Sequence, residues 1–236
     1  MRIGSPREIK IHEYRVGLTP AGVGELVAHG HEVWIETDAG AGIGVSDEAY
    51  RKAGAQIAAS PEALFSRVEL VVKVKEPQPR ECALLSEGQT LFTYLHLAPD
   101  PQQARALLAS GCIAIAYETV IDAQGGLPLL APMSEVAGRM AIQAGAHALE
   151  KWQGGIGVLL GGVPGVAPAE VLVIGGGVVG THAARVAVGM GARVTVLDRS
   201  LARLKQVDEM FEGRLVTLYS TRDAIERCTA SADLVI

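Results

Sequence analysis

The chain has 236 residues, of which 49% are hydrophobic and 20% charged, a composition that excludes a disordered or fibrous protein. Its length exceeds the usual size of a single core and favours two domains. The formal net charge of -5 argues against a function that depends on neutralising nucleic-acid phosphates, but it leaves room for a small anionic ligand held by one or two cations.

The N-terminus and the cysteines indicate where the protein acts. Residues 1–10, MRIGSPREIK, carry charges where a signal peptide needs an apolar run, and no segment has about 18 uninterrupted apolar residues. The three cysteines, Cys82, Cys112 and Cys228, are odd in number and lack the spacing of metal ligands. We therefore expect a cytoplasmic protein with no membrane association, no disulfide and no bound metal.

In the first half of the chain, short apolar runs rich in β-branched residues alternate with helical patterns. The runs predict strands at 31–36, 68–75, 90–96 and 112–118. Helices are predicted over 47–53 and 100–110. Strands that alternate with helices indicate an open sheet of parallel strands.

The middle of the chain separates two such series. Turn residues gather at 125–128, and an apolar-periodic segment from near Met133 to about Trp152 predicts a long helix. Residues 154–168 are too rich in Gly and Pro for regular structure, and a second α/β series follows. We expect two Rossmann-like, doubly wound domains with mainly parallel sheets, at 1–129 and 130–236, joined by the long helix, with the active-site cleft between them.

The last predicted strand, at 232–236, stops with the chain. A strand of a parallel sheet normally has neighbours on both sides. We therefore expect the second domain to be truncated in this chain.

The most informative segment is VLVIGGGVVGTHAARVAVGMGARVTVLDRS. An apolar strand runs into Gly175, Gly177 and Gly180 in the spacing G-x-G-x-x-G, and this turn opens a helix from about Val178. The first glycine permits a tight turn, the second lets the backbone approach a pyrophosphate, and the third lets the helix pack on the strand. The helix N-terminus then presents free N–H groups and a positive dipole to the phosphates.

A glycine turn by itself also serves simply to reverse a chain. Here a second strand follows the helix and ends at Asp198, where an acid accepts hydrogen bonds from the adenine ribose. Asp198 repels a 2′-phosphate and favours NAD over NADP, whereas the adjacent Arg199 could accommodate that phosphate. We predict an NAD site.

The first domain offers three polar candidates. Lys75 and His96 each follow an apolar strand, so both should lie at the carboxyl edge of a parallel sheet, where ligands bind. Position alone leaves other roles open: Lys75 as a solvated strand end, and His96 as a core histidine or a neighbour of a helix N-cap. Arg15 lies in the polar loop HEYRVGLTP, where a surface arginine is the default.

Several stretches together resemble the alanine dehydrogenase family, within the wider group that includes the NAD-binding part of proton-translocating transhydrogenase. They are REIK with E.RV.LTP near the start, KVKEP, LFTYLHLAPD, PMSEVAGRMAIQAGA and the glycine turn, and the likeness covers the whole chain. The resemblance implies that Arg15 and Lys75 bind the substrate and that His96 is the acid/base residue. It also implies cofactor contacts from Ser134, Val178, Val179, Asp198, Arg203 and Ser220.

The activity implied by the resemblance is the reversible, NAD-dependent oxidative deamination of L-alanine to pyruvate and ammonium. The resemblance also implies a homo-oligomer, a hexamer, with a C-terminal segment that completes the substrate domain and supplies a catalytic aspartate beyond Ile236. Two other functions stay open: an NAD-binding transhydrogenase subunit and a non-catalytic nucleotide-sensing relative. The saccharopine dehydrogenases are a more distant relative, and the FTYLHLA stretch argues against them.

Overall fold

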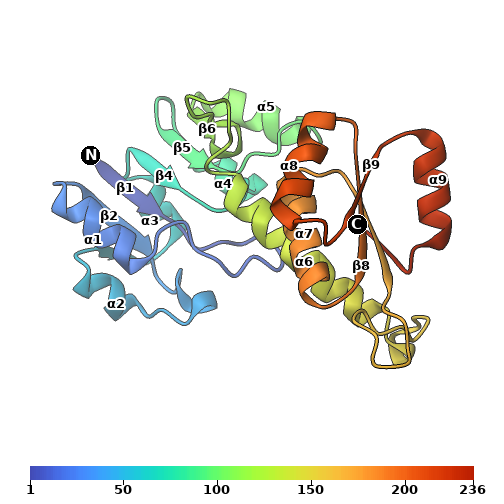
Figure 1. The fold of residues 1–236 in the computed structure, drawn as a ribbon. Coiled ribbons are helices and arrows are strands. Elements are labelled where there is room, and N and C mark those ends of the chain that lie inside the picture. Colours follow the sequence, from blue (N-terminus) through green and yellow to red (C-terminus); the bar gives the residue numbers. More distant parts are fainter. The chain divides into compact units, whose positions relative to one another are not determined.

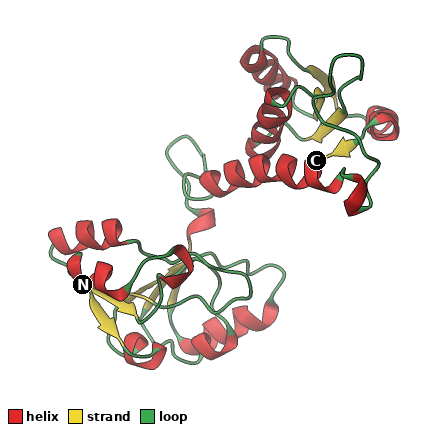
Figure 2. Ribbon diagram, turned by 90° about the horizontal axis from the view of Figure 1, so that it is seen from below, coloured by secondary structure: helices red, strands yellow, loops and turns green.

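The computed structural model describes residues 1–236, which form two compact units, Met1–Leu129 and Leu130–Ile236. Figure 1 follows the elements along the chain, and Figure 2 shows that helices surround the strands in each unit. Every strand pair in both sheets is parallel. The prediction of two parallel α/β sheets joined by a long helix is confirmed.

The first unit contains a six-stranded sheet in the order β3-β2-β1-β4-β5-β6. Its strands are β1 (Arg2–Ser5), β2 (Glu32–Glu36), β3 (Gln56–Ala58), β4 (Leu70–Val72), β5 (Thr90–Thr93) and β6 (Ile113–Ala116). Its helices are α1 (Pro20–Ala28), α2 (Asp47–Lys52), α3 (Pro61–Phe65), α4 (Pro79–Cys82) and α5 (Pro101–Ser110). A 3₁₀ turn, Tyr117–Thr119, follows β6.

Local sequence explains where these helices begin. The side chains of Thr19, Ser60 and Asp100 accept hydrogen bonds from first-turn N–H groups, and each precedes a proline at the first helical position. Proline is tolerated there because its missing N–H would have no helical partner. Each of these three helices therefore begins at a defined residue after the strand that precedes it in the chain.

The strand order defines an edge at which a site can form. The chain winds from β1 to β2 and β3 on one side, then returns to β4 beside β1 and continues outward through β5 and β6. Adjacent parallel strands whose connections leave in opposite directions open a crevice at their carboxyl ends. In this unit the direction of winding changes between β1 and β4.

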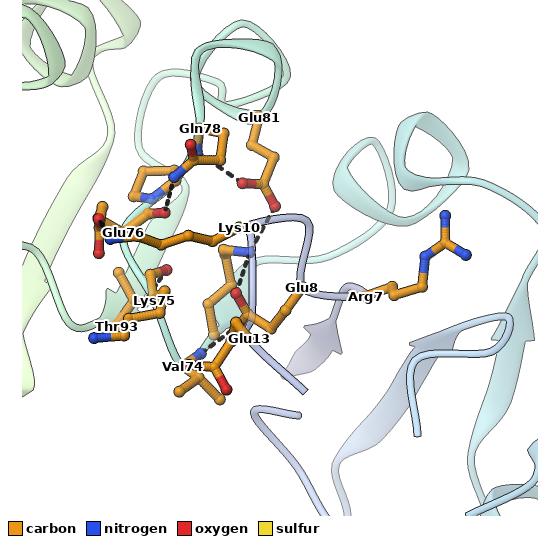
Figure 3. A network of polar contacts seen from close by, with 12 residues as sticks. Arg7, Glu8, Lys10, Glu13, Val74, Lys75, Glu76, Gln78, Glu81 and Thr93 are labelled. Atoms are coloured by element: carbon orange, nitrogen blue, oxygen red, sulfur yellow. Dashed lines mark hydrogen bonds and ion pairs between the residues drawn. The ribbon is translucent and has the colours of Figure 1, made fainter. Parts of the chain in front are cut away.

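A buried ion network lies directly after the end of β4 (Figure 3). The ammonium of Lys73, whose side chain is 0% exposed, lies 2.6 Å from Glu81 and 3.2 Å from Glu8. The second carboxylate oxygen of Glu8 accepts the N–H of Val74 at 2.7 Å, and that of Glu81 accepts the N–H of Gln78 at 2.8 Å. Burial raises the pKa of Glu8, while the attraction of Lys73 opposes that rise.

The second unit contains a four-stranded sheet in the order β10-β7-β8-β9. Its strands are β7 (Glu170–Ile174), β8 (Arg193–Asp198), β9 (Val216–Tyr219) and β10 (Leu234–Val235). Its helices are α6 (Ala131–Ala148), α7 (Val178–Gly189), α8 (Leu201–Phe211) and α9 (Arg222–Ser231). The winding direction reverses between β7 and β10, so the glycine turn after β7 also lies where the direction of winding changes, the usual position of a ligand site in such sheets.

Three strands of the first unit end earlier than predicted, two of them for one physical reason. The strand predicted at 112–118 ends at Ala116, and the 3₁₀ turn Tyr117–Thr119 follows it. The strand predicted at 68–75 is regular only over β4, because the N–H of Val74 bonds to the carboxylate of Glu8 instead of a strand neighbour. The strand predicted at 90–96 is regular only over β5, because the next free N–H groups, of Leu95 and His96, bond to Glu118. Carboxylates from other segments end both strands.

Other differences arise from short elements and glycine. The sequence did not predict β1, β3, α1, α3 and α4, most of which span only three to five residues. The helix predicted from Met133 to Trp152 begins slightly earlier and ends at Ala148. The N–H of Gly157 folds back onto the carbonyl of Leu149, and Gly154 adopts a left-handed φ of 86°.

None of the helices is both long enough and apolar enough to cross a membrane.

Replacement of Lys73 tests the ion network. Lys73→Met leaves Glu8 and Glu81 buried without their cation, and we expect it to lower the free energy of unfolding by about 3–5 kcal/mol. Urea denaturation followed by circular dichroism measures this loss. The exposed Lys52 provides the control, because Lys52→Met should change stability by less than about 0.5 kcal/mol. Adding Glu8→Gln and Glu81→Gln to Lys73→Met should restore part of the loss; no recovery would contradict the charge explanation.

Candidate functional site

In the first unit, two of the predicted site residues contact one aromatic ring. The ammonium of Lys75 lies 5.2 Å from the ring centre of Tyr94, a cation–π arrangement. The rings of Tyr94 and His96 have their centres 4.4 Å apart. Lys75 follows β4 and His96 follows β5, so the adjoining ends of two strands bring the cation and the imidazole together.

The third predicted residue, Arg15, lies in the loop after β1 and is paired with Glu13. Its Nε and a terminal nitrogen donate to the two carboxylate oxygens at 2.8 and 2.6 Å, a bidentate geometry. The hydrogen bond from Arg15 is the largest cause that lowers the pKa of Glu13, and the charge of Lys75 lowers it further. Glu13 thus experiences the field of both cations predicted to bind substrate.

The backbone of His96 is held in an unusual conformation. Its φ is 48°, in the left-handed region, which costs a residue with a Cβ about 1–2 kcal/mol. The N–H groups of Leu95 and His96 both donate to one oxygen of Glu118, at 3.0 and 3.1 Å. The other oxygen of Glu118 is buried and has no hydrogen-bond partner.

Tyr117 fixes the residue that precedes Lys75. Its hydroxyl donates to the carbonyl of Val74 at 2.6 Å. Burial is the main cause that raises the pKa of Tyr117 to about 12. The phenol therefore keeps its proton and remains a donor throughout the neutral pH range. On the other side of Val74, the carbonyl of Lys75 accepts a hydrogen bond from the hydroxyl of Thr93 at 2.8 Å.

Four residues of this site were missing from the sequence-based prediction. They are Glu13, Tyr94, Tyr117 and Glu118. Tyr94 carried a usable signal, because residues two apart on a strand point to the same face and Tyr94 precedes His96 by two. Glu13 lies only two residues from Arg15, whereas Tyr117 and Glu118 act through distant contacts that no local pattern reveals.

In the second unit, the glycine turn has the geometry that its spacing predicts. Gly175 has a φ of 110°, which only glycine adopts readily. A Cβ on Gly180 would overlap the carbonyl oxygen of Gly175, whereas a Cβ on Gly177 would meet nothing within 4 Å. Gly177 is the N-cap of α7 and has no side chain to bond the N–H groups of the first turn. The helix end is thus open to an anion.

Asp198, at the end of β8, binds the glycine turn directly. Its carboxylate accepts the N–H of Gly176 and the N–H of Ser200, each at 2.8 Å. These backbone hydrogen bonds, that from Ser200 first, lower the pKa of Asp198. The carboxylate is therefore ionised at neutral pH.

Arg203 also contacts the turn, both directly and through Thr181, a residue that the sequence-based prediction omitted. Its Nε donates to the carbonyl of Gly176, and a terminal nitrogen donates to Thr181 at 2.7 Å. The hydroxyl of Thr181 donates to the same carbonyl at 3.0 Å. The remaining terminal nitrogen donates to Gln206 at 2.9 Å. Two guanidinium nitrogens of Arg203 thus brace the turn from α8, and the third bonds within α8.

The remaining predicted cofactor contacts lie close to these groups or on elements packed against them. Val178 and Val179 form the first turn of α7 and are 42% and 40% exposed. The N–H of Ser220 donates to the carbonyl of Asp198 at 3.0 Å. Ser134 lies on α6, one turn before Gly138, where a Cβ would overlap the carbonyl of Val179. No group of three His, Cys, Asp or Glu side chains is arranged to hold a metal ion.

A parallel sheet with an open helix N-terminus after its glycine turn and an acid at the end of the next strand defines the second unit as a Rossmann-type dinucleotide-binding domain. Family models identify the chain more closely. Residues 4–137 match the model "Alanine dehydrogenase/PNT, N-terminal domain", and residues 141–236 match "Alanine dehydrogenase/PNT, C-terminal domain". The chain belongs to this family.

Individual relatives agree with this assignment. The chain is 58% identical over all 236 residues to an alanine dehydrogenase from Halomonas elongata, and it spans 64% of that protein's length. A solved structure named L-alanine dehydrogenase matches with a TM-score of 0.94 at 52% identity, over 100% of this chain and 65% of that one. A transhydrogenase from Sinorhizobium meliloti shares the fold alone, with a TM-score of 0.81 at 22% identity over 100% of this chain and 68% of that one.

The close approach at Gly180 can be tested by one added methyl group. Gly180→Ala places a Cβ against the backbone of Gly175, and we expect it to lower the free energy of unfolding by at least about 2 kcal/mol. The matched control is Gly189→Ala in the same helix, where a Cβ meets nothing within 4 Å. It should leave stability unchanged or raise it by up to about 1 kcal/mol. Thermal unfolding of both variants measures the difference, and equal effects would contradict the packing argument.

Proposed function

We propose that the protein catalyses the reversible, NAD-dependent oxidative deamination of L-alanine to pyruvate and ammonium. The observation that carries the proposal is the arrangement of Lys75, Tyr94 and His96 at adjoining strand ends, with Arg15 on the loop after β1. The ring of Tyr94 thus contacts both a cation and a residue that can transfer a proton. The names of the relatives at more than half identity support the same reaction.

The substrate's carboxylate has two cations to bind. Arg15 offers a planar fork that matches a carboxylate, and Lys75 offers a point charge. Glu13 occupies that fork in the structure and experiences the charge of Lys75 as well. We infer that the carboxylate of alanine or pyruvate takes over the interactions that Glu13 makes with Arg15.

His96 is the proposed acid/base residue. An imidazole can accept and return a proton near neutral pH. In the direction of deamination, it would take a proton from the substrate nitrogen and release it to solvent. It would then take a proton from the attacking water and return that proton to the nitrogen as it leaves. Its ring is exposed beside Tyr94, so it can reach a bound substrate without unfolding the loop.

The glycine turn, the open end of α7 and the Asp198 carboxylate fit a dinucleotide. Val178 and Val179 offer first-turn N–H groups to a pyrophosphate, and Asp198 has lone pairs left for a ribose hydroxyl. NAD, when bound, supplies the hydride acceptor. Because Asp198 is ionised, it repels a 2′-phosphate, and we propose NAD in preference to NADP despite the adjacent Arg199. As the family resemblance implies, the enzyme works as a cytoplasmic hexamer.

An assay of the complete polypeptide tests the reaction. Alanine with NAD should give NADH, and pyruvate with ammonium should consume it, both followed by the absorbance of NADH. NADP should support less than one tenth of the rate with NAD, because Asp198 opposes its phosphate. Hydride exchange between nucleotides without any response to alanine would indicate a transhydrogenase subunit instead. NADH binding with no turnover would indicate a nucleotide sensor.

Two kinds of variant should separate binding from proton transfer. His96→Ala removes the acid/base group and should lower kcat at least 100-fold, with NADH affinity unchanged. Arg15→Lys and Lys75→Met should instead raise the KM for pyruvate at least tenfold. Steady-state kinetics and NADH fluorescence titration give these values. Turnover of His96→Ala near that of the parent would remove His96 from the mechanism.

A further inference from the structure

We propose that Glu118 is a positioning residue that sets the place of His96, and that it acts by accepting hydrogen bonds from the backbone. The proposal rests on the function proposed above for His96. It starts from an unusual arrangement: one oxygen of Glu118 accepts two consecutive N–H groups, while its other oxygen is buried without any partner. A carboxylate oxygen that accepts two consecutive backbone N–H groups fixes where both lie, so this contact determines the path of the chain through Leu95 and His96.

The hydrogen bonds of Glu118 act where the chain leaves β5. Beyond Thr93, the N–H of Tyr94 still reaches the neighbouring segment, at the carbonyl of Val74. The next N–H groups, of Leu95 and His96, have no strand neighbour to bond, and both donate to Glu118. Leu95 is 1% exposed, so its N–H has no access to water and depends on this acceptor. Glu118 thereby stabilises the left-handed backbone of His96.

The same 3₁₀ turn carries Tyr117, which acts on the other strand. The Tyr117 hydroxyl bonds to the carbonyl of Val74, one residue before Lys75. The ring of Tyr117 also packs edge-on against that of Tyr94, at 5.4 Å between ring centres. Consecutive residues thus anchor the segments that carry Lys75 and His96. The turn after β6 sets the separation between the substrate cation and the acid/base group.

The proposal distinguishes hydrogen-bond acceptance from charge. Glu118→Gln keeps a carbonyl oxygen able to accept both N–H groups, so it should retain kcat within threefold. Glu118→Ala removes the acceptor and should lower kcat at least tenfold. The KM for pyruvate should change less than threefold in both, because Arg15 and Lys75 keep their places. Thr119→Ala is the matched control: its hydroxyl bonds only within the same turn, to Ala116, and both constants should stay at the parent values.

A second measurement does not depend on turnover. Amide hydrogen exchange of the peptide that contains Leu95 and His96, measured by mass spectrometry on the complete polypeptide, should be at least tenfold faster in Glu118→Ala. It should stay at the parent rate in Glu118→Gln and Thr119→Ala. If the alanine variant does not fold, Glu118→Asp replaces it, because its side chain is one methylene too short to reach both N–H groups, and it should show the same losses.

The two measurements separate failure of this proposal from failure of the proposed function. If the parent protein lacks alanine-dependent turnover, the proposed function fails, whereas the exchange rates still decide whether Glu118 holds this backbone. Parent-like exchange in Glu118→Ala would overturn the positioning role. So would an equal loss of kcat in Glu118→Gln and Glu118→Ala, because the charge would then matter and not the acceptor.

Discussion

The buried ammonium of Lys73 is the constraint on which the first unit's site depends. A charge that is 0% exposed is tolerable only beside opposite charge, and Glu8 and Glu81 supply it. Glu8 comes from the loop after β1 and Glu81 from α4, so one cation joins three segments. Lys75 lies two residues beyond Lys73, and Arg15 lies seven residues beyond Glu8 on the same loop. The two cations proposed to bind substrate therefore lie on segments that the Lys73 ion pairs hold together.

The same device recurs wherever a strand ends near the proposed chemistry. Glu8 accepts the N–H of Val74 after β4, Glu118 accepts two N–H groups after β5, and Asp198 accepts the N–H of Gly176 after β7. Backbone N–H groups beyond a sheet must find partners, because leaving them unpaired in a buried position is costly. A carboxylate satisfies them without extending the strand. The chain can then turn and present a functional side chain or an open helix end.

The sequence was sufficient where the determinants are local. The glycine turn, the acid at the end of β8, and a lysine and a histidine after apolar strands can each be found within a few adjacent residues. The contacts that fix these residues are not local: Glu8 lies 66 residues from Val74, and Glu118 lies 22 from His96. No periodicity links such pairs. Strands as short as β3 could not be predicted for a different reason: three residues are too few to show an alternating pattern.

The pairing of Arg15 with Glu13 bears on selectivity if the proposed reaction is correct. A substrate carboxylate that replaces Glu13 exchanges one bidentate ion pair for another, so the net electrostatic gain at Arg15 is small. Lys75 adds a second attraction, but it acts on Glu13 as well. Since every amino acid and 2-oxo acid carries the same carboxylate, these cations cannot distinguish alanine from larger substrates. Discrimination must come from the surface around the substrate's side chain, and we expect the ring of Tyr94, which contacts both Lys75 and His96, to form part of it.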